Sequence, residues 1–89
     1  MVFITGIKAK RVNGKIEVII FTFNLSPPLF PYYAEAETDI GMKSGSIRLA
    51  MPPGTGDNVE VSDRYRQASK VTARVKFLGG VTDEKTVAV

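Results

Sequence analysis

The segment Arg64–Phe77, RYRQASKVTARVKF, concentrates positive charge and contains no acidic residue. Cations at alternate positions of a β-strand lie about 6.6–6.8 Å apart on one face, close to the phosphate spacing of a single nucleic-acid strand. An aromatic ring beside such a row can stack on a base, as in small β-barrels that bind single strands. The segment therefore predicts binding of single-stranded DNA or RNA, with low sequence specificity because phosphate contacts do not read bases. The predicted nucleic-acid-binding residues are Arg64, Tyr65, Arg66, Lys70, Arg74 and Lys76, extended by Lys8 and Lys10.

The same segment also fits a purely structural explanation. Charged side chains at alternate positions are commonly the solvated face of a strand whose other face fills the core. Three carboxylates, Glu35, Glu37 and Asp39, share one face of another expected strand, where they could pair with the basic row across a sheet. A flat row of carboxylates spreads its oxygen atoms, so it does not predict a Mg²⁺ site. No metal ion and no cofactor is expected.

The residue types in the chain exclude several classes of chemistry. The sequence has no histidine and no cysteine, so the commonest general base, thiolate nucleophiles and soft-metal ligands are missing. Ser69 and Lys70 are adjacent, and on a strand they lie on opposite faces, so they cannot act as nucleophile and base. The GTGD segment at 54–57 lacks the Gly-Lys-Ser/Thr ending of a phosphate-binding loop. The sequence therefore predicts a protein that is not an enzyme.

The elements that must position these residues read as short strands. Asn13–Gly14 is a strong signal for a two-residue hairpin turn, and its register places Ile7, Ala9, Ile16, Val18 and Ile20 on one face. A second hairpin turn is predicted at Ser44–Gly45, which would pair Ile40 with Leu49. Further strands are predicted at NVEVS (58–62) and at TVAV (86–89), with breaks at 25–33 and 79–84.

The basic segment itself fits two assignments. Residues 70–78 alternate strictly between apolar and polar, which predicts a strand, whereas a helix starting at Ser62 and ending at Gly79 is the alternative. With this strand the pattern predicts an all-β fold. It is a small single-domain barrel or sandwich over residues 1–89, with about seven short, mostly antiparallel strands.

The second face of the first hairpin favours another function. Far from its turn it would carry an apolar patch of a size that monomers seldom expose. The proline-rich segment LSPPLFPYY (25–33) adds a docking surface with a preordered backbone, unless its apolar residues plug one end of the core. This predicts a structural or scaffold subunit of a larger assembly, such as a virion or multiprotein complex, or a homo-oligomer. The predicted protein-interface residues are Ile4, Ile19, Phe21, Phe23, Leu29, Phe30 and Tyr33.

Charge and hydropathy bear on a third possible function and on the location of the protein in the cell. The formal net charge is +3, with an acidic middle between two basic ends. The acidic middle is also compatible with a third function, an inhibitor that mimics or blocks a partner's surface. No apolar run is long enough to cross a bilayer and the first residues lack a signal-peptide pattern, so a cytoplasmic or virion-internal location without membrane contact is expected.

Overall fold

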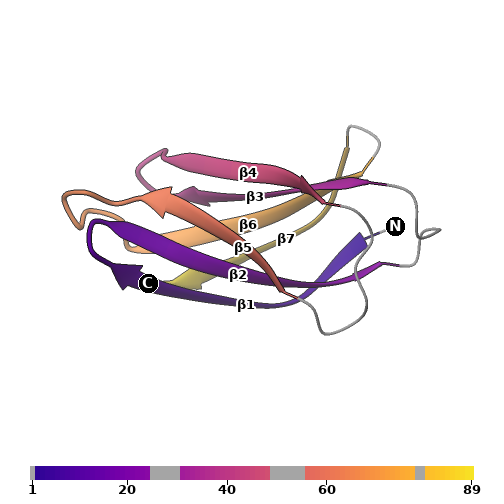
Figure 1. Ribbon diagram of the computed structural model, residues 1–89, viewed down its shortest axis with the longest axis horizontal. Coiled ribbons are helices and arrows are strands. Elements are labelled where there is room, and N and C mark those ends of the chain that lie inside the picture. The colour runs from indigo at the N-terminus through magenta and orange to yellow at the C-terminus, as the bar shows by residue number, and fades with distance from the viewer. Residues whose placement is uncertain (1, 25–30, 49–55, 78–79) are drawn as a thin grey trace.

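Seven strands form two stacked antiparallel sheets (Figure 1). The computed structural model describes residues 2–24, 31–48, 56–77 and 80–89. Sheet A has the strand order β1-β2-β5, and sheet B has the order β4-β3-β6-β7. The all-β prediction is confirmed, and of the two predicted architectures the fold is a sandwich rather than a closed barrel. The strands are β1 (Val2–Val12), β2 (Lys15–Asn24), β3 (Tyr32–Thr38), β4 (Lys43–Arg48), β5 (Gly56–Ser62), β6 (Lys70–Phe77) and β7 (Gly80–Ala88).

The core fills the space between the two sheets. Bulky aliphatic side chains of sheet A face the middle of sheet B, where the small residues Ala34, Ala36 and Ala73 are buried and Ala36 is paired to Ala73. Large residues against small ones allow aligned sheets to pack at the density of protein interiors. The buried Tyr32 hydroxyl donates a hydrogen bond of 2.6 Å to Asp57 Oδ2 and thereby links the two sheets. The buried apolar residues are Val2, Ile4, Ile16, Val18, Ile20, Tyr32, Ala34, Ala36, Val59, Val61, Ala68, Val71, Ala73 and Val75.

The first hairpin has the register that its turn predicts. Asn13 and Gly14 both have positive φ, at 46° and 83°, which a two-residue turn that follows the strand twist requires. Lys10 pairs with Glu17 and Ala9 pairs with Val18, as predicted. The predicted core face is confirmed, since its β2 residues are buried and its β1 residues pack partly against the core.

Ile4 does not lie on the outer apolar face, and the sequence prediction is wrong there. The β1–β2 register shifts between Ile4 and Gly6, which leaves Thr5 as a bulge. An extra residue reverses the inside–outside alternation beyond it. Ile4 consequently faces the core with only 4% of its surface exposed, whereas Phe3, paired with Phe23, takes the outer position.

The second hairpin turns four residues earlier than predicted. Strand β3 pairs with β4 so that Glu37 lies opposite Lys43, and residues 39–42 form the connection. Gly41 supplies the positive φ of 89° that this connection needs, and the Thr38 hydroxyl accepts a hydrogen bond from the Met42 N–H. The predicted turn at Ser44–Gly45 is wrong, because those residues lie within β4.

The basic segment contains a strand and not a helix. Strand β6 begins at Lys70, and its burial alternates with Val71, Ala73 and Val75 inside, which confirms the strand prediction. Residues 63–69 form the connection that precedes it. The predicted break at 79–84 is wrong from Gly80 onward, because β7 already begins there and pairs with β6.

Side chains close the edge between the two sheets where β1 passes β7. The Thr82 hydroxyl donates to the Val2 carbonyl at 2.8 Å, and the Ile4 N–H donates to Asp83 Oδ2 at 2.8 Å. The β6–β7 register shifts beside Thr82, between Val75 and Lys76. These bonds use backbone groups that an open strand edge would otherwise present to another chain.

Candidate binding surfaces

Two cations of the predicted basic row, Arg74 and Lys76, are paired with carboxylates on the outer face of sheet B. Arg74 bridges two strands, with Nη1 2.7 Å from Glu37 Oε1 and Nε 2.6 Å from Glu84 Oε2. The hydrogen bond from Arg74 is the main cause that lowers the pKa of Glu37, and the bond to Glu37 is the main cause that raises that of Arg74. At Arg74 the sheet therefore contains the cross-strand ion pairing that the structural explanation of the basic segment predicted.

Glu35 is a buried carboxylate on this outer face. Only 1% of it is exposed, and Lys76 Nζ lies 2.6 Å from its Oε1 while Lys43 Nζ lies 3.7 Å from its Oε2. Lys76 Nζ also lies 5.9 Å from the centre of the Tyr33 ring, within cation–π range. Lys76, like Arg74, is thus already held by groups of sheet B, in this case by a carboxylate and an aromatic ring.

Arg64, Tyr65 and Arg66 lie elsewhere, in the connection between β5 and β6. All three are exposed, and Tyr65 exposes 75% of its surface. Arg66 has a φ of 53°, a left-handed conformation that non-glycine residues seldom adopt. The Arg66 N–H donates to the Asp63 carbonyl at 3.1 Å, which closes the turn that carries these three side chains.

The buried Asp63 carboxylate holds this connection in place. Its Oδ1 accepts hydrogen bonds from the N–H groups of Gln67 and Ala68, at 3.0 and 3.1 Å, and Arg11 Nε lies 2.8 Å from Oδ2. Arg11 also donates to the Ala68 carbonyl. These bonds, that from Arg11 first among them, hold the pKa of Asp63 below its ordinary value. The connection therefore has a shape set by the sandwich before any partner binds.

The β3–β4 connection lies against the same part of the molecule. Asp39 Oδ2 accepts a bond from the Ser69 hydroxyl at 2.5 Å and Oδ1 accepts one from the Ser69 N–H at 3.0 Å. The bond from the Ser69 hydroxyl is the largest cause that lowers the pKa of Asp39. Two connections far apart in sequence are thus tied together at the end of the sandwich drawn on the left of Figure 1.

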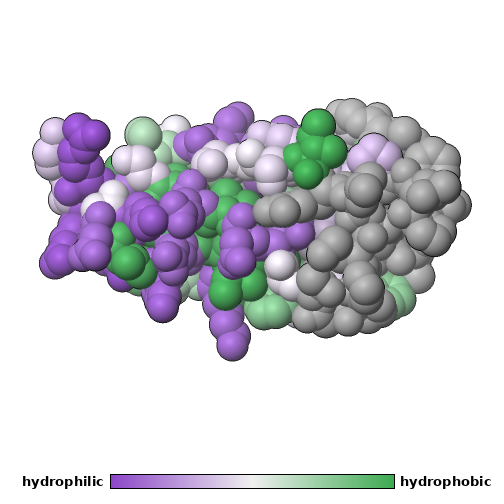
Figure 2. Space-filling view, viewed as in Figure 1, coloured by the Kyte–Doolittle hydropathy of each residue, from purple (hydrophilic) through white to green (hydrophobic). Residues whose placement is uncertain are grey.

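Exposed apolar side chains lie beside Arg64 at this end. Ile40 and Met42 expose 44% and 43% of their surfaces, and with Tyr65 they line an open pocket of about 470 Å³. Figure 2 shows mainly hydrophilic side chains over this end of the molecule, with small hydrophobic areas among them. Ile40, Met42, Arg64, Tyr65 and Arg66 together are called the loop-end surface below. Ile40 and Met42 are not among the predicted site residues, because the predicted hairpin places them in strands, although Gly41 between them is a turn signal.

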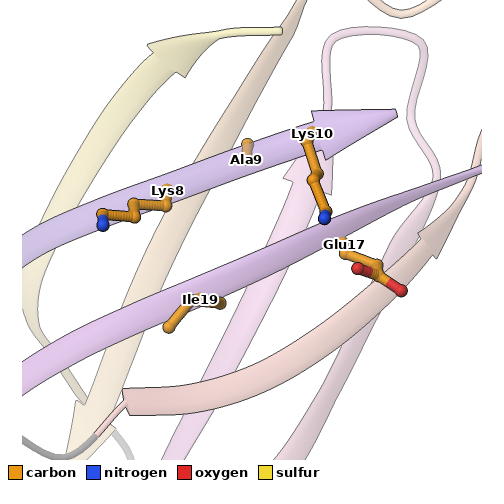
Figure 3. A pocket seen from close by; sticks show the side chains of 5 residues that line it. All are labelled: Lys8, Ala9, Lys10, Glu17 and Ile19. Carbon is orange, nitrogen blue, oxygen red and sulfur yellow. The ribbon is translucent and has the colours of Figure 1, made fainter. Parts of the chain in front are cut away.

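Lys8 and Lys10 lie on the outer face of sheet A. Figure 3 shows them on β1, beside Glu17 and Ile19 of β2, around an open pocket of about 360 Å³. The eight predicted nucleic-acid-binding residues thus fall on three surfaces. Those of sheets A and B face opposite sides of the sandwich, and Lys70 is exposed at the start of β6, next to the β5–β6 connection.

The aromatic residues of sheet A form an apolar strip on the same outer face. Phe21 pairs with Gly6 of β1 and Gly56 of β5, and an added Cβ on Gly56 would lie 3.2 Å from the Phe21 ring. A ring laid over glycines shields an otherwise bare sheet. Ile19 and Phe21 are half-buried and Phe23 is 39% exposed, so three of the predicted interface residues stay together on the surface.

The remaining predicted interface residues do not share this strip. Tyr33 is partly exposed on the outer face of sheet B, paired with Ile47 and Lys76. Leu29 and Phe30 lie outside the described residues. Within the described ranges no group of His, Cys, Asp or Glu could hold a metal ion, and no helix is long and apolar enough to cross a membrane.

The strand order defines a Greek-key β-sandwich. Named in chain order, the strands lie as in an immunoglobulin constant domain, except that the fourth strand joins the third instead of the fifth. This arrangement defines an architecture, not an activity, because such sandwiches carry many functions. No protein-family model matches the chain, and no curated protein is similar to it in sequence.

Proposed function

We propose that the chain is a non-enzymatic binding module that contacts another protein through the loop-end surface, as a subunit of a larger assembly. One observation carries this proposal. Three of the large hydrophobic residues exposed in the described part of the chain, Ile40, Met42 and Tyr65, gather at one end of the sandwich beside two exposed arginines. Tyr, Met and Arg are the residue types enriched in protein interfaces.

The supports beneath this surface favour the same function. Asp63 fixes the β5–β6 connection by accepting bonds from the Gln67 and Ala68 N–H groups, and Asp39 of the β3–β4 connection accepts bonds from the N–H and hydroxyl of Ser69, which join the two connections. A surface whose backbone is ordered before association loses less conformational entropy when it binds. Arg66 is held in its left-handed conformation by the same turn, and local backbone strain of this kind clusters at functional sites.

Nucleic-acid binding is the second candidate, supported by the exposed sequence Arg64–Tyr65–Arg66. None of the described residues forms an ion pair with either arginine, and the ring between them is open to stacking. Arg74 and Lys76 would have to leave carboxylates at 2.6–2.7 Å before they could hold phosphates. The loop-end surface, rather than the strand, is the part that would contact an oligonucleotide.

Selection from a random peptide library tests the proposed function without a known partner. Peptides enriched on the wild-type protein should lose binding to the triple variant Ile40→Ser/Met42→Ser/Tyr65→Ser. They should keep binding to Ile47→Ser, which removes a side chain that is 73% exposed on the outer face of sheet B. Peptides that bind the triple variant as well as the wild type would place the binding surface elsewhere and overturn the proposal. Circular dichroism and Tm confirm that each variant folds.

A further inference from the structure

The loop-end surface presents two exposed cations that are open to a partner. Arg64 and Arg66 flank Tyr65, and no described residue pairs with them. The acidic residues near them are already engaged. Glu60, which lines a surface pocket together with Arg64, is paired with Lys15 Nζ at 2.9 Å. Asp63 accepts bonds from Arg11 and two loop N–H groups, and Asp39 accepts them from the hydroxyl and N–H of Ser69.

An open pocket that combines apolar and polar side chains lies beside Arg64, and Ser62, Asp63 and Gln67 are its polar residues. Ile40, Met42 and Tyr65 line it together with Arg64, and its volume of about 470 Å³ is within the range of ~300–1,000 Å³ typical of ligand pockets. Desolvated apolar anchors next to charged groups are the usual composition of an interface centre and its rim. An occupant of matching chemistry has one apolar side chain for the pocket and carboxylates for the arginines.

From this arrangement we infer that the loop-end surface binds an acidic peptide segment. The segment inserts an aliphatic or aromatic side chain between Ile40, Met42 and Tyr65 and places flanking carboxylates against Arg64 and Arg66. This inference rests on the proposed function and adds the chemistry of the partner. Bidentate pairing between guanidinium and carboxylate groups supplies orientation, and the apolar anchor supplies most of the affinity.

An acidic peptide fits this surface better than a nucleic-acid strand does. Exposed Ile40 and Met42 side chains gain nothing from a phosphate backbone, whereas burying them beneath an apolar side chain removes their surface from water. Nucleic-acid affinity grows with the number of phosphates neutralised, and only two arginines of this surface are available for that purpose. Of the β6 cations, Arg74 and Lys76 are already paired on the outer face of sheet B, and only Lys70 at the start of the strand is left exposed.

Fluorescence anisotropy with defined probes tests the inference on the intact protein. The first probe is a short labelled peptide with a central Leu-Phe pair between Asp and Glu residues. A second peptide has Asn and Gln flanks, a third has Gly-Ser at the centre, and the fourth probe is a single-stranded DNA oligonucleotide. The first peptide should bind about tenfold more tightly than either altered peptide, a difference that corresponds to about 1.4 kcal/mol for each contribution.

Two variants assign the two contributions to residues. Arg64→Gln/Arg66→Gln should remove the advantage of acidic flanks and keep that of the Leu-Phe centre, whereas Met42→Ser should do the reverse. Lys8→Gln/Lys10→Gln is the matched control, because it removes the same charge from the outer face of sheet A and should leave binding unchanged. All of these side chains are exposed, so the variants should fold with a Tm close to that of the wild type.

The outcomes separate this inference from the function on which it rests. Equal affinity for acidic and neutral flanks, with binding still lost in Met42→Ser, would overturn the acidic partner and leave protein binding standing. Absence of binding by all three peptides would also overturn the acidic partner, and the library selection would then decide the proposed function. Tighter binding of the oligonucleotide, lost in Arg64→Gln/Arg66→Gln, would overturn both in favour of nucleic-acid binding.

Discussion

Arg11 Nε lies 2.8 Å from Asp63 Oδ2 and joins the first strand to the connection that carries Arg64, Tyr65 and Arg66. The Asp63 side chain is fully buried, whereas the Arg11 side chain is 34% exposed. The other carboxylate oxygen of Asp63 accepts two backbone N–H groups of the connection. The Asp63 carboxylate therefore fixes the β5–β6 connection relative to β1. The shape of the loop-end surface depends on this carboxylate.

Replacing Asp63 should loosen this connection. Asp63→Ala leaves the Gln67 and Ala68 N–H groups and the Arg11 guanidinium without their acceptor, so Tm should fall by several degrees. Hydrogen exchange at Gln67 and Ala68 should accelerate more than exchange in the centre of β2. The loss of stability in the double variant Arg11→Ala/Asp63→Ala should be smaller than the sum of the losses in the two single variants, because the two residues act as a pair. Strict additivity would contradict the pairing.

Acid should destabilise the fold through three carboxylates. The pKa values of Asp63, Asp39 and Glu37 are held below their ordinary values, chiefly by bonds from Arg11, Ser69 and Arg74 respectively. Each group binds protons more weakly in the folded chain than in the unfolded chain. Its contribution to stability is therefore complete above the unfolded pKa, about 4, and is lost as pH falls below it.

Thermal unfolding measured between neutral and strongly acidic pH checks this expectation. Tm should be nearly constant at mildly acidic and neutral pH, because the chain has no histidine to titrate there, and should fall below about pH 4. Asp63→Asn should be less stable at neutral pH and should lose less stability on acidification than the wild type. A Tm that does not change down to about pH 3 would show that these bonds do not stabilise the ionised carboxylates.

Gly45 should tolerate no side chain, because β3 passes too close to it. An added Cβ would lie 2.7 Å from the Ala34 carbonyl oxygen and 2.8 Å from Glu35 Cβ, both far inside van der Waals contact. Gly45→Ala should therefore lower the free energy of unfolding by about 1–3 kcal/mol, measured by urea denaturation. Gly80→Ala is the control, because its nearest atom beyond chain neighbours is 4.0 Å away, and its stability should be unchanged or higher. Equal stability of the two variants would contradict the close approach.

Local turn chemistry explains which parts of the fold could be predicted. Asn13–Gly14 admits one tight turn, and the strict alternation after Lys70 admits one buried face, so both elements follow from neighbouring residues alone. The second hairpin offers two glycines four residues apart. Gly41 supplies the positive φ of the turn, whereas Gly45 allows the close approach of β3, and only the paired strand distinguishes these two roles.

The site was harder to predict because it depends on neighbours that are remote in sequence. A bulge at Thr5 moves Ile4 into the core, and only the neighbouring Gly6 is a residue type that signals it weakly. The charge of β6 is visible in the sequence, but its neutralisation depends on β3 and β7 lying on either side of it. Similarly, Ile40 and Tyr65 meet only because two connections meet at one end of the sandwich.

Reversing charge should have opposite consequences at Arg74 and at Arg64. Arg74→Glu places a third carboxylate between Glu37 and Glu84, whose oxygens now lie 2.6–2.7 Å from the guanidinium, so repulsion replaces two ion pairs. Tm should fall clearly, and it should fall less in high salt because salt screens exposed charges. Arg64→Glu should leave Tm nearly unchanged, since no described residue pairs with Arg64, while it weakens binding of acidic peptides. If Arg74→Glu instead keeps the wild-type Tm, the ion pairs of sheet B contribute nothing to stability, and the basic strand is again free to bind a polyanion.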